Sequence, residues 1–364
     1  MKLKTLVIAV LVLVGLSVTV HFATRPAPPS EADPRVGTPL LDRATATSAT
    51  RLTISSQGAS VTLQRDSNNT WKVSSYHNIP ADFSKLARFI SELTTTKIDR
   101  FVTANPERLS RLEFSDTTIT LTDGTGKTLW SMTLGKTAEN GGRFLRFPGA
   151  DRAYLARLNV YTDATAKNWA DTSLVSVEPN TIAKVELTFA DGDPIIATRP
   201  TAEAPFTAAD APDDQQLKAS AISSLVTTLT GLRFIDTAAF DTPDAVAARE
   251  HTRIATLTTF NGQTTTIRLG RRPEVPAPEP APTDAKPEEN AEPPAAAATP
   301  AGPVFVQVQS SNDNAWINTI GDELVFKISD YPFTNLPKTR ADLFEPKPAP
   351  APAASGSPAP RKTP

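Results

Sequence analysis

The stretch that decides the fold is TITLTDGTGKTLWSMTLG, residues 118–135, and it recurs in outline as RIATLTTFNGQTTTIRLG, residues 253–270. In each stretch, two runs rich in β-branched residues flank a turn signal, Asp-Gly in the first and Asn-Gly in the second. Both patterns predict an antiparallel hairpin. Each stretch closes on a glycine, Gly135 or Gly270, where we expect the second strand to end.

The two hairpins belong to a longer internal repeat with an offset of roughly 136 positions. Two helical stripes spaced i, i+3, i+4, i+7 match at this offset, and they are Leu86, Phe89, Ile90 and Leu93 in the first copy and Ile222, Leu225, Val226 and Leu229 in the second. Past the hairpin the offset becomes about 162, so that Tyr154 matches Trp316. We therefore predict an α+β fold with two tandem repeats, residues 51–178 and 183–344, each a mainly antiparallel sheet with a packed helix.

The N-terminus predicts where the chain acts. Two lysines precede an apolar run, and residues 5–23 are long enough to cross a bilayer. A cleaved signal peptide and an uncleaved anchor both fit this run. We favour a transmembrane anchor, because His21 and Arg25 stand where cleavage needs small residues. Residues 1–4 would then be cytoplasmic, and the bulk of the chain would lie on the periplasmic or extracytoplasmic side of a bacterial inner membrane.

Three segments are too rich in proline, alanine and polar residues to bury a core. They hold many of the 33 prolines. We expect residues 24–50 to be a disordered stalk, residues 273–303 a disordered insertion between strands of the second repeat, and residues 345–364 a disordered tail.

Composition excludes several classes of protein. The chain has no cysteine, which removes disulfides, thiolate catalysis, cysteine-bound metals and a lipidated cysteine anchor. Its formal charge of -2 gives no basic field for nucleic acid. Core packing must therefore stabilise the protein.

The strand order around Trp71, the helix at 84–95, the hairpin with Asp123-Gly124 and the run Gly141-Gly142-Arg143-Phe144 resemble the bacterial domain-of-unknown-function family 4340. The resemblance covers most of residues 51–178 and, more weakly, 183–340. It implies a membrane-anchored envelope protein that accompanies ABC transporters of the gliding-motility type. It carries no catalytic residues over to this chain.

One motif invites a nucleotide-binding interpretation. Gly124-Thr125-Gly126-Lys127-Thr128 contains the end of a phosphate-binding loop, but Leu121 stands where that loop needs its first glycine. The segment also joins two strands, whereas phosphate binding uses the start of a helix. We predict a hairpin turn with a solvated lysine and no nucleotide cofactor.

Other polar residues are equally well explained by structure. His77 and His251 lack metal-ligand spacing. The acidic pairs, Asp191 with Asp193 and Asp213 with Asp214, fit turns and helix caps. Asn68-Asn69-Thr70 reads as a turn, and Tyr76, Tyr161 and Trp316 as packing residues. We predict no catalytic, cofactor-binding or metal-binding residue.

The leading hypothesis is a non-enzymatic, extracytoplasmic interaction protein that serves as an accessory of an ABC-transporter-linked envelope complex, with partners among transporter subunits or other envelope proteins. A module that binds an envelope glycan or small solute is the first alternative. An envelope hydrolase is the second, and it would need titratable groups clustered in one pocket.

Overall fold

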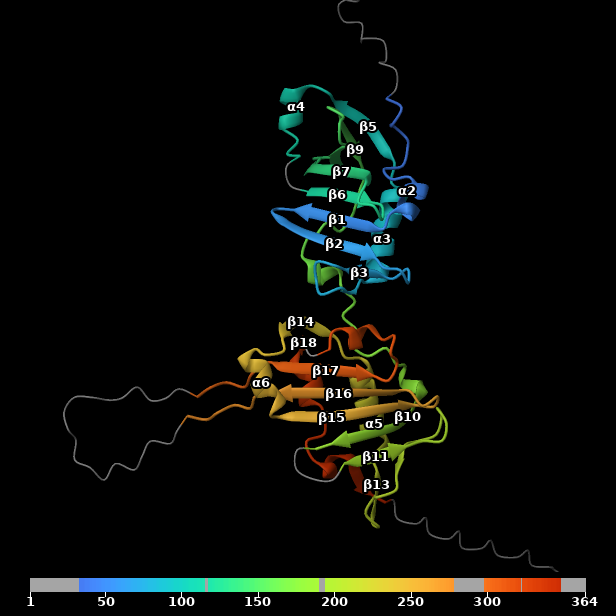
Figure 1. Ribbon diagram of the computed structural model, residues 1–364, viewed down its shortest axis with the longest axis vertical. Coiled ribbons are helices and arrows are strands. Elements are labelled where there is room, and N and C mark those ends of the chain that lie inside the picture. The colour runs from blue at the N-terminus through green and yellow to red at the C-terminus, as the bar shows by residue number, and fades with distance from the viewer. Residues whose placement is uncertain (1–32, 115–116, 190–193, 278–297, 322, 348–364) are drawn as a thin grey trace, which may run out of the picture. The chain divides into compact units, whose positions relative to one another are not determined.

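The computed structural model describes residues 33–114, 117–189, 194–277, 298–321 and 323–347 (Figure 1). The chain divides into two compact units, and the division follows Ala170. Each unit is built on one large sheet whose neighbouring strands are antiparallel.

The first sheet has nine strands. In spatial order they are β4 (Ile79–Pro80), β3 (Trp71–Val73), β2 (Ala59–Arg65), β1 (Arg51–Ser56), β6 (Thr117–Thr122), β7 (Thr128–Thr137), β8 (Arg143–Arg146), β9 (Ala153–Ala156) and β5 (Ile98–Thr103). The helices among the described residues of this unit are α2 (Arg43–Ser48), α3 (Phe83–Thr95), α4 (Pro106–Ser110) and the short 3-10 helix η1 (Ala166–Trp169).

The second sheet has eight strands. In spatial order they are β12 (Thr207–Ala208), β11 (Ile195–Thr198), β10 (Ile182–Thr188), β15 (Thr252–Thr259), β16 (Thr264–Arg271), β17 (Val304–Ser310), β18 (Leu324–Ile328) and β14 (Phe234–Ala239). A separate pair joins β13 (Gln215–Leu217) to β19 (Phe344–Pro346). The helices are α5 (Ala219–Thr230), α6 (Pro243–Arg249), α7 (Asp330–Thr334), η2 (Pro179–Thr181), η3 (Trp316–Thr319) and η4 (Arg340–Leu343).

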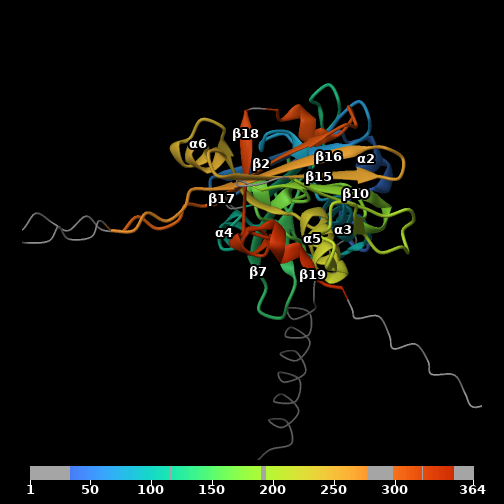
Figure 2. The same ribbon diagram turned by 90° about the horizontal axis from the view of Figure 1, so that it is seen from below.

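The two sheets share one strand order. The run β2-β1-β6-β7-β8-β9-β5 of the first unit has the same connectivity as β11-β10-β15-β16-β17-β18-β14 of the second. In each unit a long helix, α3 or α5, directly precedes the last strand of this order, and a short helix, α4 or α6, directly follows it. In the second unit α5 lies on one face of the sheet and α6 on the other (Figure 2).

The core of each unit lies between the sheet and its long helix. On α3 the buried residues are Leu86, Phe89 and Leu93, which confirms the predicted stripe apart from the half-buried Ile90. The carboxylate of Asp82 accepts a hydrogen bond from the Lys85 backbone N–H and thereby begins this helix. All four predicted stripe residues of α5 are buried.

The predicted fold class, α+β with an N-terminal transmembrane helix, is wrong. The described chain is mostly antiparallel sheet with a few helices, the longest being α3 with 13 residues and α5 with 12. Alternating apolar and polar residues place most of the regular secondary structure of each unit in strands. Within the described ranges, no helix is both long and apolar enough to cross a membrane. Residues 5–23, where the anchor was predicted, lie outside those ranges.

The predicted disordered stalk, residues 24–50, is wrong for the part that the structure describes. Residues 33–50 pack onto the first unit, with Leu40 and Leu41 buried. The indole N–H of Trp130 donates to the Leu40 carbonyl at 2.9 Å. Burial of the two leucines, together with hydrogen bonds from the Leu40 and Leu41 backbone N–H groups to the Thr96 and Leu93 carbonyls, holds this otherwise polar segment on the unit.

The matches after the hairpins also need correction. Gly135 and Gly270 do not end their strands, because β7 and β16 continue past them. Cross-strand pairing makes Phe326, not Trp316, the counterpart of Tyr154, since Leu145 pairs with Tyr154 and Val306 pairs with Phe326. Trp316 belongs to η3, for which the first unit has no counterpart at that place in its strand order.

Two boundaries differ from those predicted. Residues after Ala170 belong to the second unit, where the Leu174 backbone N–H donates to the Leu232 carbonyl at 3.0 Å, whereas we expected the first repeat to reach residue 178. The base of the predicted insertion is paired, because Val275 and Thr299 form a β-bridge. Residues 278–297 and 348–364, the greater part of the insertion and of the tail, lie outside the described ranges.

Candidate functional site

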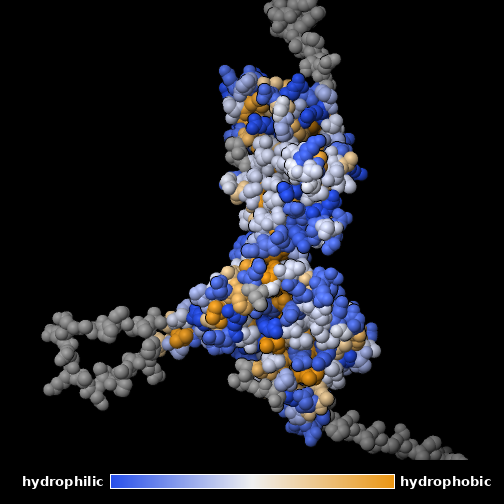
Figure 3. Space-filling view, in the orientation of Figure 1, coloured by the Kyte–Doolittle hydropathy of each residue, from blue (hydrophilic) through white to orange (hydrophobic). Residues whose placement is uncertain are grey.

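An open groove lies on the outer face of the second sheet, the face opposite α5. Its volume is about 300 Å³. Among the residues that line it are Ala245 and Ala248 of α6, Ile254 of β15, Arg268 of β16, Phe305 of β17 and Val325 of β18. Figure 3 looks onto this face and shows apolar surface beside α6. The groove thus combines an apolar floor with a cationic side chain.

Small residues hold the groove open. A Cβ on Gly270 would collide with the carbonyl oxygen of Ala248, so α6 rests directly on the backbone of β16. Only glycine allows this approach. Because Ala245 and Ala248 are the residues that α6 buries, the helix covers the sheet with methyl groups alone. The space beside it therefore stays unfilled.

The cationic side chain is Arg268, which is half-buried and pairs across the strands with Gln307. Within the described ranges its guanidinium makes no hydrogen bond or ion pair. The neighbouring Arg249 differs, because its guanidinium stacks 3.7 Å from the centroid of the Phe240 ring and donates to the Phe240 carbonyl. Arg268 is therefore the charge in this groove that an incoming group can pair with.

A second, more polar pocket of about 490 Å³ continues from the groove past Arg268 and Gln307. It exists because β17 pairs with β18 only through Val304–Val306, after which the strands part. The connection between them is fixed by Asn318, whose amide donates to the Ser310 carbonyl at 2.8 Å. Polar solutes with several hydrogen-bonding groups suit such a lining.

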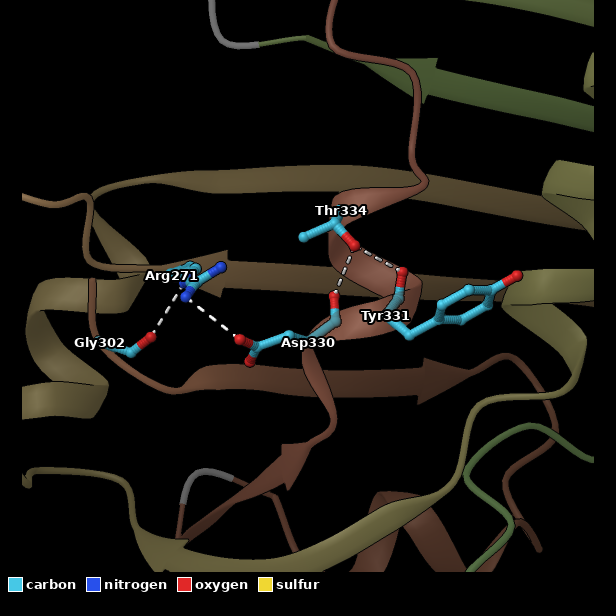
Figure 4. A network of polar contacts seen from close by, with 5 residues as sticks. All are labelled: Arg271, Gly302, Asp330, Tyr331 and Thr334. Carbon is cyan, nitrogen blue, oxygen red and sulfur yellow. Dashed lines mark hydrogen bonds and ion pairs between the residues drawn. The ribbon is translucent and has the colours of Figure 1, made fainter. Parts of the chain in front are cut away.

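The base of the insertion lies at the end of β16 (Figure 4). Arg271 donates from Nε to the Gly302 carbonyl at 3.0 Å and pairs with the Asp330 carboxylate at 3.2 Å. The Thr334 hydroxyl donates to the backbone carbonyls of Asp330 and Tyr331 and so stabilises the turn of α7. One arginine thus joins both sides of the insertion base to α7.

The first unit has a polar network around Asp163. Its carboxylate accepts hydrogen bonds from the Tyr161 hydroxyl at 2.7 Å, the Thr165 N–H at 2.7 Å and the Asn168 amide. Burial on its own would raise the pKa of Asp163, but these hydrogen bonds outweigh it and hold the pKa well below its usual range. Burial and the bond to Asp163 raise the pKa of Tyr161 to about 12. This network closes the unit, because the indole N–H of Trp169 also donates to the Asp163 carbonyl.

A profile of the family described as "Domain of unknown function (DUF4340)" matches residues 71–252, which is half of the chain. The protein belongs to the DUF4340 family. Comparison with curated proteins and with solved structures gave no match.

The DUF4340 match begins at Trp71, the first residue of β3, and ends at Thr252, the first residue of β15. It therefore runs from the first sheet through α5 and α6 of the second unit. Of the groove, it contains the α6 wall, whereas Arg268 and Gln307 follow it in the sequence.

The structure places the two histidines of interest in separate turns. His77 is exposed in the turn after β3, where its backbone φ of 53° is left-handed, and its ring lies 5.1 Å from that of Tyr76. His251 is exposed between α6 and β15, and its backbone N–H donates to the Ala248 carbonyl. They belong to different units.

The acidic pairs have different outcomes. Asp191 and Asp193 lie outside the described ranges. The prediction that Asp213 and Asp214 cap a helix is wrong, because α5 begins only at Ala219. Their backbone carbonyls instead accept hydrogen bonds from Lys347. Over the described residues no group of three His, Asp or Glu side chains is placed to hold a metal ion.

The segment that ends in Gly-Lys-Thr is a hairpin turn between β6 and β7, as predicted. The Asp123 carboxylate accepts hydrogen bonds from the Lys127 and Thr125 backbone N–H groups, and the Lys127 side chain is exposed. The predicted turn at Asn68-Asn69 is also confirmed, because Asp66 accepts from the Asn68 N–H and Asn69 has a positive φ.

The three aromatic candidates have mixed surroundings. Trp316 is half-buried and packs edge-on against Phe326, with 5.9 Å between ring centroids. Tyr161 is 43% exposed, but its ring packs on Trp169 and lies beneath the Lys85 ammonium. Tyr76 is half-buried beside His77.

Sequence analysis missed the groove. Arg268 and Gln307 follow the ordinary alternation of a strand, so nothing local marks them as functional. A signal was present in the repeat itself, because Leu112 and Phe114 of the first copy meet Ala248 and Glu250 of the second at the common offset. The loss of two large apolar side chains at matched positions predicts an open surface.

Proposed function

We propose that this DUF4340 protein is a non-enzymatic interaction protein that acts outside the cytoplasm and contacts a partner protein through the groove on its second sheet. One observation carries the proposal. The groove leaves an apolar floor and an unpaired arginine exposed at a place that the first unit closes with its own side chains. Apolar surface next to unpaired charge is typical of a contact site.

The proposed location and partner rest on the sequence. Two lysines followed by an apolar run are typical of exported chains. The resemblance to family 4340 favours a partner within an ABC-transporter-linked envelope complex, such as a transporter subunit.

Crosslinking in membranes tests both parts. A photo-reactive amino acid at Gln307, which lines the groove, should give a discrete crosslinked product that contains a transporter or other envelope subunit. Arg146 of the first unit is the matched control, because it holds the equivalent strand position, and it should give none. Crosslinking equal at both positions, or no product at Gln307 after repeated trials, contradicts the proposal.

The more polar pocket favours a second candidate function, the binding of a small polar solute or glycan fragment. Gln307, Gln309 and Asn318 supply amide groups around about 490 Å³. A panel of envelope sugars and amino acids should then raise the melting temperature of the wild-type protein, by mass action. The rise should shrink in Gln309→Leu, and a flat panel would count against this candidate.

A further inference from the structure

The outer faces of the two units carry equivalent clusters beside their short helices. In the first unit, Leu112, Phe114 and Ala153 form the buried cluster, with Leu109 and Phe144 packed on it. In the second, the buried cluster is Ala245, Ala248, Phe305 and Val325, with Ala238 and Phe240 packed on it. Strand pairing and the common offset match Leu109 with Ala245, Leu112 with Ala248, Phe144 with Phe305 and Ala153 with Val325.

One member of the first cluster has no equivalent in the second. A Cβ on Gly135 would lie 2.9 Å from the Phe114 ring, so this ring fills the space above β7. At the offset of the repeat, Phe114 corresponds to Glu250, whose side chain is exposed. Above Gly270 the groove occupies the corresponding space. The second unit therefore has no aromatic ring at the position of Phe114, and Phe240, which packs on its cluster, is not among the residues that line the groove.

Each unit has an arginine beside this space, in the same cross-strand pair but on opposite strands of it. In the first unit Arg146 of β8 lies opposite Thr133 of β7, and its guanidinium lies 5.1 Å from the Phe114 ring centroid. In the second unit the same cross-strand pair is Arg268 and Gln307. Since Arg268 has no partner within the described ranges, both the ring and the anion that could accompany it are missing.

We propose that the groove binds a segment of a partner protein that inserts an aromatic side chain above Gly270, where Phe114 lies in the first unit, and pairs a neighbouring carboxylate with Arg268. This rests on the proposed function and specifies the chemistry of the partner. Charge complementarity favours the carboxylate, and the first unit itself shows the sequence type, Glu113 followed by Phe114.

The first unit supplies the probe. A fluorescent, N-acetylated and C-amidated peptide that copies residues 109–118, LSRLEFSDTT, is titrated with the full chain and followed by anisotropy. We expect saturable binding. Replacing its phenylalanine by alanine should weaken binding about tenfold or more, because a buried ring supplies much of the affinity. Replacing its glutamate by glutamine should weaken binding about threefold to tenfold.

Two variants of the protein test the site, and one serves as the control. Glu250→Phe supplies the missing ring within the chain and should abolish peptide binding while keeping or raising the melting temperature, which shows that the variant is folded. Arg268→Gln should weaken binding to the same extent as the peptide's glutamate-to-glutamine change. Arg146→Gln, at the filled site of the first unit, should leave binding unchanged.

Three results would overturn the proposal. The first is no binding by the wild-type chain at millimolar peptide. The second is equal binding by wild type and Glu250→Phe. The third is dimerisation of the chain that Glu250→Phe abolishes while the peptide does not bind, which would make a second copy the occupant. A crosslinked partner at Gln307 together with a silent peptide would leave the proposed function standing and remove only this chemistry.

Discussion

The two units share a strand order but differ in how their outer faces are closed. Each has a buried amphipathic helix on one face and a glycine pressed against a carbonyl on the other. The first has Leu112 and Phe114 over its outer cluster, whereas the second has Ala248 and Glu250 at the matched positions and leaves a groove. The difference teaches that the sheet, the long helix and the glycine belong to the common scaffold, while the cover of the outer face has specialised.

Core truncation should have the largest effect and should be equal in the two units. Leu93 of α3 and Leu229 of α5 are matched and have no exposed surface. Leu93→Ala and Leu229→Ala should each lower the free energy of unfolding of their unit by about 2–5 kcal/mol, through lost burial and the cavity left behind. Denaturant unfolding measures this. Ser91→Ala on the exposed side of α3 is the control, and a large inequality between the leucines would contradict a common scaffold.

The paired glycines should come next. Gly135→Ala and Gly270→Ala place a methyl group against a carbonyl oxygen, Leu112 in one unit and Ala248 in the other. Each should cost about 1–3 kcal/mol of unfolding free energy, because the segment that carries the carbonyl must move away from the strand. Gly124→Ala, at an open hairpin turn, should cost far less. If Gly270→Ala is tolerated, the two close approaches are not equivalent.

Lowering the pH should reduce the stability of the first unit through protonation of Asp163. The folded-state pKa of this carboxyl lies well below its unfolded value of 3.8, so its contribution to stability is present above about pH 4 and is lost as the pH falls. Asp163→Asn should therefore lower the melting temperature of the first unit at pH 7, and the gap from wild type should narrow toward pH 3. Calorimetry at several pH values measures the gap. A gap independent of pH would show that the carboxylate charge does not matter.

The smallest effect is expected at the end of the second hairpin strand. Arg271 links the Gly302 carbonyl and Asp330, whereas its counterpart Lys136 makes a single exposed ion pair with Glu113 at 3.5 Å. Arg271→Ala should cost about 1 kcal/mol, and Lys136→Ala about 0.5 kcal/mol or less. Denaturant unfolding resolves the two, and equal costs would mean that Arg271 does not stabilise the insertion base.

The sequence pattern correctly predicted the elements in which apolar residues recur at regular spacing. The stripes of α3 and α5 and the hairpin around Asp123 all follow from residue spacing and turn chemistry. The polar neighbours of Leu40 and Leu41 predict a stalk, and only the distant Trp130 shows where this segment packs. Composition predicts disorder for this segment, but its tertiary contacts give it a fixed position.

The groove lay beyond local prediction for a similar reason. Gly135 and Gly270 matched in sequence, but their role depends on carbonyls contributed by residues 112 and 248. Register across strands, which places Arg268 opposite Gln307, depends on pairing that a single strand does not encode. Comparison of the two copies at those positions provides the missing information.

The position of the edge strands has a kinetic consequence. Within its sheet β5 pairs with β9, and β14 pairs with β18, so each joins its sheet only through a strand that follows it in sequence. The start of each strand also bonds to an earlier segment, Ile98 to Thr38 and Phe234 to Thr172. In the second unit, the chain between β14 and its partner β18 also contains the insertion between β16 and β17. Each doubling of a loop adds only about 0.6 kcal/mol to its closure, so the insertion costs little stability. We nevertheless expect the edge strand to join each sheet late, and the second unit to fold more slowly than the first.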